Sequence, residues 1–420
     1  MKTSVNAAGT ASPRGAGRQF PRWSQLGPLL RADLSGMGAR ARLRRAPDVA
    51  GIREIARRRV PQAVFDYVDG AAEGEVSMAR SRDAFDTVEF RPRVLVDVAE
   101  PDPSTTILGR QARMPVVLAP TGFTRLMHHQ GEYAVAAAAA TAAVPYALST
   151  MGTVTPERLA GTRPDGADQW FQLYLWRDRS RSAELVSRAR EAGFRTLVLT
   201  VDTPVAGARL RDVRNGFSIP PKLTPRTLMN MSRHPGWWAN LLTTEPLTFA
   251  SLTETGGTVA DLVGQIFDPH VTITDLEWLR GQWEGPLVVK GVQTVADARL
   301  VVDAGADAVV VSNHGGRQLD RATTPLEELP AVVRGIGERA EVYLDGGVRT
   351  GADVVAAVAL GARACLIGRP YLYGLMAGGQ PGVSRVLDIL HADMTRTLAL
   401  LGTPTLKDLD SDSVRFRRQY

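Results

Sequence analysis

The chain has 420 residues, 44% hydrophobic and 22% charged, which is ordinary for a folded globular protein. Its single cysteine, Cys365, excludes an intrachain disulfide. The longest apolar run, around residues 134–144, is shorter than the roughly 18 residues of a membrane span. Residues 1–60 hold thirteen Lys or Arg against three acidic residues, whereas the remaining 360 hold 37 against 41, so the net charge of +6 is uneven.

Residues 1–45 are rich in Gly, Ala, Ser, Pro and Arg and lack any sustained periodicity, which predicts a basic, largely disordered tail. Such a tail favours an anionic partner, either phospholipid or nucleic acid, or else acts as a solvated extension. The first thirty residues contain no continuous apolar stretch of the kind that forms a secretory signal. We therefore expect a cytoplasmic protein, with peripheral contact to the inner face of the cell membrane as one option.

Two covering helices are predicted before the main fold. Asp48 can cap a helix that runs to Arg59, and Pro61 can occupy the first position of a second helix, which continues through Tyr67. Eight short apolar or β-branched runs follow, each of which ends at a polar, Gly- or Pro-containing loop. They span residues 116–120, 146–150, 171–175, 196–202, 287–291, 308–313, 342–347 and 365–370.

Between most of these runs lie stretches with a helical period, such as residues 181–192, 296–304 and 351–360. Gly193, Gly305 and Gly361 follow them at positions suited to helix C-caps. Apolar strands that alternate with amphipathic helices indicate a parallel sheet, and eight such units close naturally into an α/β TIM barrel. We therefore predict one (β/α)8-barrel domain over residues 46–420. An open doubly wound sheet is less favoured, because no GxGxxG turn follows the first strand.

One spacing is anomalous. About 85 residues separate the fourth strand from the fifth, and we assign residues 203–285 to an insertion over the C-terminal face of the barrel, where active sites form. The insertion contains His234-Pro235-Gly236-Trp237-Trp238, downstream of a basic stretch. Adjacent tryptophans of this kind fit an interfacial membrane anchor, and they fit aromatic packing of a loop onto the barrel equally well.

The string Ser312-Asn313-His314-Gly315-Gly316-Arg317-Gln318 follows the sixth strand and is the most informative segment. His314 lies at the C-terminal end of a barrel strand, and the glycines after it permit close approach to a ligand. Because histidine titrates near neutrality, it suits the role of a general base. Arg317 can direct a bidentate guanidinium into the same pocket.

The fourth strand ends at Asp202, which is well placed to stabilise a protonated imidazole, and Arg209 follows as a second cation. Two guanidinium groups and an imidazole that meet in one pocket suit a small anionic substrate. On the fifth strand, Lys290 is either a Schiff-base nucleophile or a cation opposite a developing anion. On the third strand, alternation directs Gln172 and Tyr174 inward.

The seventh and eighth strands end in glycine-containing loops, Asp345-Gly346-Gly347-Val348-Arg349 and Gly368-Arg369. Loops at these two positions form the recurrent phosphate site of such barrels, built from backbone N–H groups and a helix N-terminus. The sequence therefore predicts a phosphorylated cofactor. We expect no metal ligand set.

Together these strings resemble the family of FMN-dependent enzymes that oxidise L-2-hydroxy acids, which includes glycolate oxidase, mandelate dehydrogenase and L-lactate dehydrogenases. The resemblance extends from about Val49 to residues near 410. It is strongest to bacterial quinone-linked L-lactate dehydrogenases, through residues 207–216 and the His-Pro-Gly-Trp-Trp string. It implies FMN as the cofactor, a 2-hydroxy acid as the substrate, a quinone or another electron acceptor, and a homo-tetramer. We expect no nucleic-acid partner, because the predicted catalytic positions are all filled.

The resemblance also implies individual roles. Arg209 and Arg317 would bind the substrate carboxylate, His314 would act as base with Asp202 behind it, and Tyr67 and Tyr174 would bind substrate oxygens. Residues that would contact FMN are Pro120, Thr121, Gly122, Ser149, Gln172, Thr200, Lys290, Ser312, Asp345, Gly346, Gly347, Arg349, Gly368 and Arg369.

The implied reaction converts the acid to a 2-oxo acid, with the electrons leaving C2 either as a carbanion pair or as a hydride. L-Lactate is the favoured substrate. The alternatives are an oxidase or dehydrogenase for glycolate, mandelate or a larger 2-hydroxy acid, with oxygen as acceptor. Glycolate oxidases carry alanine at the place of Gly122, which argues mildly against a simple oxidase. They carry tryptophan at the place of Met151, which leaves the size of the substrate open.

Overall fold

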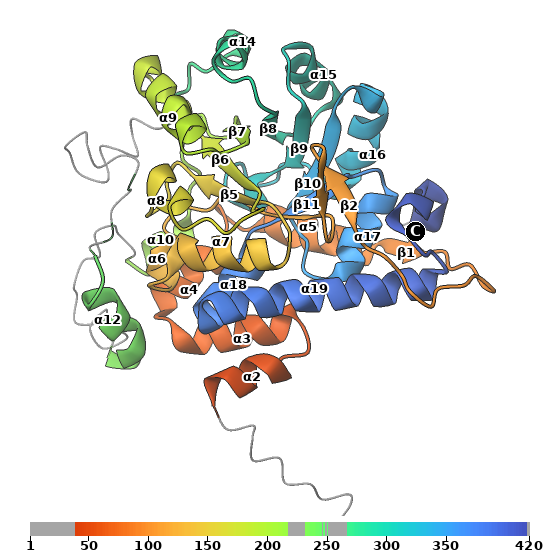
Figure 1. Cartoon of the computed structure of the whole chain (residues 1–420), viewed down its shortest axis with the longest axis horizontal. Coiled ribbons are helices and arrows are strands. Elements are labelled where there is room, and N and C mark those ends of the chain that lie inside the picture. Colours follow the sequence, from red (N-terminus) through yellow and green to blue (C-terminus); the bar gives the residue numbers. More distant parts are fainter. Residues whose placement is uncertain (1–37, 217–231, 246, 248–249, 251–266, 418–420) are drawn as a thin grey trace, which may run out of the picture.

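The computed structural model describes residues 38–216, 232–245, 247, 250 and 267–417. Its centre is a closed barrel of eight parallel strands, surrounded by an outer layer of helices (Figure 1). The strands follow one another around the barrel in chain order, and the last pairs with the first through Leu366 and Val117. They span Val116–Leu118 (β4), Tyr146–Ser149 (β5), Gln169–Leu173 (β6), Thr196–Thr200 (β7), Leu287–Val292 (β8), Ala308–Ser312 (β9), Glu341–Asp345 (β10) and Ala364–Ile367 (β11).

The predicted TIM barrel is therefore confirmed, and each of the eight predicted strands overlaps an observed one. The interior is packed with side chains, among them the fully buried Trp170 and Tyr343. An antiparallel hairpin, Thr105–Ile107 (β2) and Arg110–Ala112 (β3), contributes Ile107 to the same interior cluster. This hairpin covers the N-terminal end of the barrel, whereas the C-terminal strand ends carry the loops in which barrel sites form.

The helices between the strands also match their predictions closely, and the predicted C-cap glycines follow them with φ of +77° (Gly193), +96° (Gly305) and +104° (Gly361). The barrel helices span Thr124–Met127 (α6), Gly131–Thr141 (α7), Pro156–Ala160 (α8), Arg179–Glu191 (α9), Ile273–Gln282 (α14), Val295–Asp303 (α15), Pro325–Ile336 (α16), Gly351–Ala359 (α17), Arg369–Gly378 (α18) and Gln380–Leu401 (α19).

From residue 38 onward, four helices precede the barrel: Ala39–Arg45 (α2), Val49–Arg59 (α3), Gln62–Asp69 (α4) and Val76–Asp86 (α5). As predicted, the Asp48 side chain caps α3 by accepting from Gly51 N at 2.7 Å. Pro61 is the N-cap residue of α4, so the helix begins one residue later than predicted. A short antiparallel pair, Val88–Phe90 (β1) and Val414–Phe416 (β12), joins this region to the end of the described chain and was not predicted.

The predicted disordered tail over residues 1–45 needs a correction at its C-terminal limit. Residues 1–37 lie outside the described ranges, but Ala39–Arg45 forms α2. Helix formation is supported there because Ala41 and Leu43 are buried, and α2 packs against α18 and α19.

The predicted insertion over residues 203–285 is described in part. It contains Leu210–Arg214 (α10) and Pro235–Leu242 (α12), whereas residues 217–231, 246, 248–249 and 251–266 lie outside the described ranges. Helix α14 stands between β7 and β8 as a barrel helix does, so the inserted part ends before Ile273. Within the described ranges, every helix is too short or too polar to cross a bilayer.

Candidate active site

A cavity of about 650 Å³ opens at the C-terminal ends of the barrel strands. Most of the predicted site residues line it, namely Tyr67, Pro120, Thr121, Gly122, Ser149, Tyr174, Arg209, Lys290, His314, Arg317, Asp345, Gly346, Gly347, Arg349, Gly368 and Arg369. The other predicted residues, Gln172, Thr200, Asp202 and Ser312, lie directly behind this wall and hydrogen-bond to it or to one another. A larger cavity of about 1000 Å³ beside the β2–β3 hairpin contains none of them.

His314 begins a short 3-10 turn, His314–Gly316, after β9 and has a left-handed backbone with φ of 57°. This conformation is strained for a residue with a Cβ, and such strain is typical of functional sites. The His314 backbone N–H donates to Ser312 Oγ (3.0 Å), and its Nδ1 lies 2.9 Å from Asp202 Oδ1. Because an ionised carboxylate accepts and does not donate, Nδ1 carries the hydrogen and Nε2 is left as the basic nitrogen.

The protonation states of this pair suit proton transfer. Burial lowers the pKa of His314 below its ordinary value, and the charge on Asp202 opposes this shift without reversing it. Burial raises the pKa of Asp202, but its interactions with His314 and with the positive charge of Lys290 outweigh that effect and hold the pKa below its ordinary value. At neutral pH, His314 is therefore neutral and can accept a proton, and ionised Asp202 can stabilise the imidazolium that forms.

Gly291 makes room for Asp202. It lies at an irregularity in β8 with φ of +108°, and a Cβ added there would lie 2.6 Å from both Cβ and Cγ of Asp202. No ordinary side chain fits at that separation, so the position of the carboxylate depends on a glycine in the neighbouring strand.

Lys290 belongs to a buried polar cluster. Its Nζ lies 3.0 Å from Ser312 Oγ and 2.9 Å from Asp345 Oδ2, and Ser312 Oγ donates to the same carboxylate oxygen at 2.6 Å. Burial lowers the pKa of Lys290, but the charges of Asp345 and Asp202 outweigh it and raise the pKa above its ordinary value. Since a protonated amine is not a nucleophile, this arrangement favours the fixed cation over the Schiff base.

A row of polar side chains crosses the ends of three neighbouring strands. Ser149 Oγ donates to Gln172 Oε1, and Gln172 Nε2 donates to Thr200 Oγ1, both at 3.0 Å. Ser149 is the member of this row that lines the cavity. These two hydrogen bonds fix the orientation of the Gln172 amide. They give the cavity a polar wall against which a planar ring could lie.

The loop after β4 forms another part of the wall. Thr121 Oγ1 lies 2.5 Å from the hydroxyl of Tyr371, which itself donates to the backbone carbonyl of Ala119 at 2.8 Å. Gly122 lies against Met151, since an added Cβ would come within 3.0 Å of Met151 Cβ. Gly122 and Met151, the two positions that the sequence comparison with glycolate oxidases singled out, are therefore neighbours in space.

Arg209 and Arg317 both lie over the ring of Tyr67, with guanidinium carbons 5.9 Å and 5.1 Å from its centroid. Neither pairs with a carboxylate within 4.0 Å in the described part of the chain, and Arg317 donates instead to the carbonyls of Tyr67 (2.7 Å) and Gly70 (3.1 Å). Burial and the charge of Arg209 lower the pKa of Arg317 to about 9. Two adjacent, partly buried cations favour a bound anion, and the planar forks suit a carboxylate.

Tyr174 completes this end of the cavity. Its ring packs edge-on against Phe267, with centroids 5.8 Å apart. Burial raises the pKa of Tyr174, so its hydroxyl stays protonated and can donate a hydrogen bond to an oxygen of the substrate.

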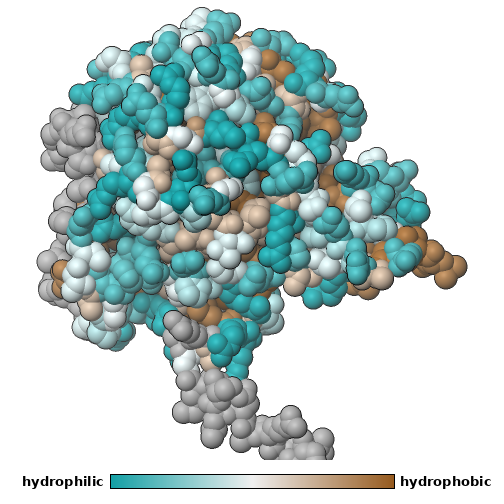
Figure 2. Space-filling model, viewed as in Figure 1, coloured by the Kyte–Doolittle hydropathy of each residue, from teal (hydrophilic) through white to brown (hydrophobic). Residues whose placement is uncertain are grey.

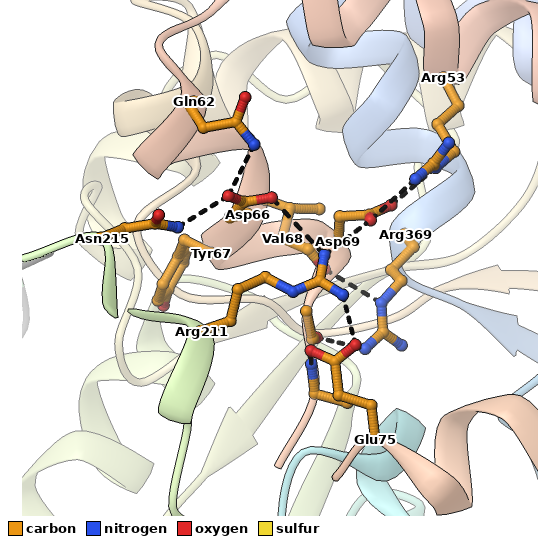
Figure 3. A network of polar contacts seen from close by, with 12 residues as sticks. Arg53, Gln62, Asp66, Tyr67, Val68, Asp69, Glu75, Arg211, Asn215 and Arg369 are labelled. Atoms are coloured by element: carbon orange, nitrogen blue, oxygen red, sulfur yellow. Dashed lines mark hydrogen bonds and ion pairs between the residues drawn. The ribbon is translucent and has the colours of Figure 1, made fainter. Parts of the chain in front are cut away.

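A second group of cations lies at the loops after β10 and β11. Arg369 donates to the carbonyls of Val68 (3.0 Å), Gly70 (2.7 Å) and Gly315 (2.9 Å), and Figure 3 shows it beside the end of α4. Burial and the charge of Arg349 lower the pKa of Arg369. Like Arg209 and Arg317, the arginines Arg349 and Arg369 are suited to hold an anion.

Three glycines shape this region of the cavity wall. Gly346 and Gly347 have φ of +116° and +81°, and an added Cβ on Gly368 would meet nothing closer than a Thr121 carbon at 3.9 Å. Glycines in such conformations turn backbone N–H groups toward an anion, and α18 begins in the same place at Arg369. The observed residues therefore fit FMN: cations and glycine backbone for its phosphate, and the Lys290 ammonium group and the polar Ser149 side chain for its ring.

A network of ion pairs outside the predicted set links α10 to α4 (Figure 3). Arg211 of α10 pairs with Asp69 (3.1 Å), with Asp66 (3.5 Å) and with Glu75. Asn215, just after α10, also donates to Asp66 at 2.7 Å.

Asp69 extends the network to two further helices. Arg53 of α3 pairs with it at 2.7 Å, and the hydroxyl of Tyr373 in α18 donates to it at 2.8 Å. Because Arg209 directly precedes α10 and Tyr67 belongs to α4, the network fixes the positions of these two cavity residues relative to each other.

Several lining residues were missed by sequence reasoning. Asp212 lines the cavity near Arg209 and Arg317. Burial raises the pKa of Asp212, and the charges of these two arginines oppose that shift. Its spacing of three residues from Arg209 on a short helix is a signal that could have identified it. Met127 and Phe267 also line the cavity, and nothing in their sequence context marks them.

Comparison with known proteins gives a consistent result. The family model described as FMN-dependent dehydrogenase matches residues 56–416. A Mycobacterium tuberculosis protein provisionally named an L-lactate dehydrogenase is 53% identical over 93% of this chain and 95% of its own length. An L-lactate dehydrogenase of Caulobacter vibrioides is 45% identical over 83% of this chain and 92% of its own.

A solved structure, described as the monotopic membrane protein (S)-mandelate dehydrogenase, matches with a TM-score of 0.84 and 37% identity. The match covers 88% of this chain and 99% of that one.

Proposed function

The chain belongs to the family of FMN-dependent dehydrogenases that oxidise 2-hydroxy acids, and from that premise we propose that it converts L-lactate to pyruvate and passes the electrons to a quinone. FMN is its cofactor and a small 2-hydroxy acid its substrate. The observation that supports this proposal most directly is that the His314–Asp202 pair, Arg209 and Arg317 meet at one cavity.

In this proposal, the two arginines bind the substrate carboxylate and so direct C2 and its hydroxyl toward His314. Tyr67 and Tyr174 contact the remaining oxygens, and Tyr174 stays protonated because burial raises its pKa. His314 accepts a proton at Nε2, and Asp202 stabilises the resulting imidazolium through Nδ1. Bound FMN supplies the two-electron acceptor. Lys290 remains protonated beside Asp345 and offers a fixed positive charge to the cavity.

L-Lactate is supported by the names of the most similar curated relatives. The second candidate is mandelate, which is favoured by the (S)-mandelate dehydrogenase structure and by Met151, a flexible side chain that can make room for an aryl group. A glycolate oxidase of Spinacia oleracea is 39% identical over 86% of this chain, so glycolate is a third candidate.

A quinone acceptor implies contact with a membrane, and we infer that α12 provides it. Trp237 is buried and packs on α6, which accounts for one of the two tryptophans as ordinary packing. Leu242, at the end of the same helix, is 75% exposed. The similar mandelate dehydrogenase is described as a monotopic membrane protein, which supports peripheral attachment here.

We further infer a homo-oligomer, with a tetramer as the expected size. Val94 and Leu95, in the loop between β1 and β2, are 80% and 104% exposed. Figure 2 shows this loop as a brown projection at the right edge, where Figure 1 places the segment after β1. Apolar side chains at the tip of a projecting loop favour burial against another subunit.

The proposal is tested by anaerobic bleaching of the bound flavin with L-lactate, glycolate and (S)-mandelate. The reduced protein is then mixed with a soluble quinone analogue or with oxygen. We expect fastest bleaching by L-lactate and reoxidation by the quinone without hydrogen peroxide. His314→Gln should slow bleaching by roughly 10²–10⁴-fold, as expected when a general base is removed. A preference for mandelate would refute L-lactate, and peroxide formed at a comparable rate would refute the quinone.

A further inference from the structure

A second cavity, of about 530 Å³, lies between α3, α6 and α12. Met127 lines both this cavity and the candidate active site, so the two are neighbours. Within the described ranges, the second cavity is lined by no Asp or Glu but by five arginines: Arg42, Arg58, Arg59, Arg125 and Arg233.

Among the described residues, these charges lack a close carboxylate partner. In the part of the chain that the structure describes, none of the five arginines lies within 4.0 Å of a carboxylate oxygen. Arg59 and Arg125 donate instead to the backbone carbonyls of Ala377 (2.5 Å) and Glu245 (2.6 Å). Burial and the charge of Arg42 lower the pKa of Arg59, as expected for crowded like charges. A concave surface with such a charge attracts anions.

Three histidines add hydrogen-bonding groups without adding charge. Burial, together with His129 and Arg59, lowers the pKa of His128 to about 4, and burial also lowers the pKa of His129 and of His234. All three are therefore neutral at pH 7. The Nδ1 of His128 accepts from Gln130 N at 3.3 Å, so its Nε2 carries the hydrogen and can donate to an oxygen anion.

The cavity adjoins an apolar helix at the edge of the molecule. Trp237 holds α12 in place, because its Nε1 donates to the carbonyl of Leu126 in α6 at 2.9 Å. Figure 1 shows α12 beyond α6 and α3 at the periphery, and Leu242 at its C-terminal end is 75% exposed. A ligand that satisfies both features has an anionic group and an apolar part.

We propose that this cavity binds the phosphate of an anionic phospholipid headgroup, while α12 lies in the adjacent lipid. Guanidinium forks and neutral imidazole N–H groups are strong donors to phosphate oxygens. A free phosphate ion would satisfy the arginines but would give the exposed end of α12 no apolar partner. The inference rests on the membrane contact proposed above and is independent of which 2-hydroxy acid is oxidised.

The experiment is sedimentation of the FMN-loaded, full-length protein with vesicles of phosphatidylglycerol or phosphatidylcholine at low salt. The test variant, R42Q/R58Q/R233Q, removes three exposed cavity arginines. We expect it to weaken binding to phosphatidylglycerol at least roughly tenfold and to change binding to phosphatidylcholine little. The charge-preserving variant R42K/R58K/R233K should retain most of the binding.

A matched control, R299Q/R334Q/R363Q, removes the same charge from exposed arginines of α15, of α16 and of the residue before β11, away from the cavity. It should bind phosphatidylglycerol like the wild type. Flavin bleaching by L-lactate should be unchanged in every variant, and it reports the oxidation reaction separately from lipid binding.

Unchanged phosphatidylglycerol binding by the glutamine variant would overturn the headgroup site and leave the membrane contact standing. If the wild type sedimented with neither vesicle, both the contact and the headgroup site would fail, while flavin bleaching would still report on the enzyme. Saturable binding of inorganic phosphate that the glutamine variant lacks, without vesicle binding, would identify a soluble anion and overturn the lipid assignment.

Discussion

At the scale of single residues, His314 and Asp202 act as one unit whose parts come from different strands. The 2.9 Å contact between Nδ1 and Oδ1 sets the tautomer of the imidazole and opposes the lowering of its pKa by burial. Asp202 Oδ2 is buried and has no hydrogen-bond partner in the described part of the chain, so the negative charge is directed mainly at His314.

This arrangement predicts a pH dependence with a definite sign. His314 must be neutral to accept a proton, and burial holds its pKa below the ordinary value of 6.5. We expect kcat/KM to be constant at neutral pH and to fall as the pH drops through that lowered pKa. In Asp202→Asn the charge that raises the pKa of His314 is absent, so the acid limb should move to lower pH while the plateau falls. The pH profile of flavin bleaching measures both effects, and an acid limb that moved to higher pH would contradict this account.

Gly291 gives a prediction of steric origin. In Gly291→Ala, the new Cβ must displace Asp202, since the two Cβ atoms would otherwise lie 2.6 Å apart, and φ of +108° adds backbone strain. We expect bleaching to slow by at least roughly tenfold, with a loss of about 1–3 kcal/mol in the free energy of unfolding. The control is Gly281→Ala in α14, where an added Cβ meets nothing within 4 Å. It should leave the rate unchanged, and equal rates in the two variants would refute the steric role.

At the scale of elements, the barrel was predictable because its information is local. Each strand is a short apolar run, and each end carries a residue such as Asp202, Lys290 or Asp345 whose chemistry is visible in the sequence. Since parallel barrel strands direct their C-terminal ends to one face, order along the chain was enough to predict which side chains meet.

The rest of the site could not be predicted, because its contacts join residues that no local pattern relates. Arg211 pairs with Asp69 across 142 positions, and β1 pairs with β12 across more than 300. Arg211 is one of many arginines in this chain, and its partners follow from packing between helices. The C-terminal limit of the tail was missed for a similar reason, since α2 depends on its contacts with α18 and α19.

The Arg211 network predicts an effect on substrate binding through Arg209. Arg211→Gln removes the ion pairs with Asp69, Asp66 and Glu75, so α10 should lose its fixed position on α4. We expect the KM for the 2-hydroxy acid to rise by roughly tenfold, with a smaller change in kcat, because the carboxylate loses a positioned partner. Arg211→Lys should recover part of the loss.

The matched control is Arg214→Gln on the same helix. Arg214 is exposed and makes no hydrogen bond or ion pair through its side chain with the described residues, so its removal should leave the KM unchanged. A purely structural role for Arg211 would lower the unfolding temperature of the Gln variant without changing the ratio of kcat to KM.

At the scale of the whole molecule, the cavity gathers residues from nearly the full length of the described chain. Tyr67 comes from a helix before the barrel, Arg209 from the insertion, and Arg369 from the start of α18. Arg369 and Arg317 donate to carbonyls at the end of α4, so a helix outside the barrel contributes to both of the proposed anion sites.

This construction predicts that FMN contributes strongly to stability. A ligand bound by the native fold alone raises the free energy of unfolding by about 4 kcal/mol at a thousand times its Kd. In the protein without FMN, no phosphate offsets the repulsion between the like charges of Arg349 and Arg369. We expect removal of FMN to lower the unfolding temperature by several degrees, and added FMN to restore it. Calorimetry of both forms measures this shift, and identical transitions would contradict it.

The pairing of β11 with β4 has a consequence for biosynthesis. Thr121, which follows β4, lies beside Gly368, which follows β11, since a Cβ added to Gly368 would lie 3.9 Å from Thr121 Cγ2. The two residues are nevertheless 247 positions apart in the chain. A nascent chain therefore cannot hold the flavin until its last barrel strand has left the ribosome. The yellow colour of a preparation should report complete synthesis, and a fragment that stops before residue 364 should be colourless.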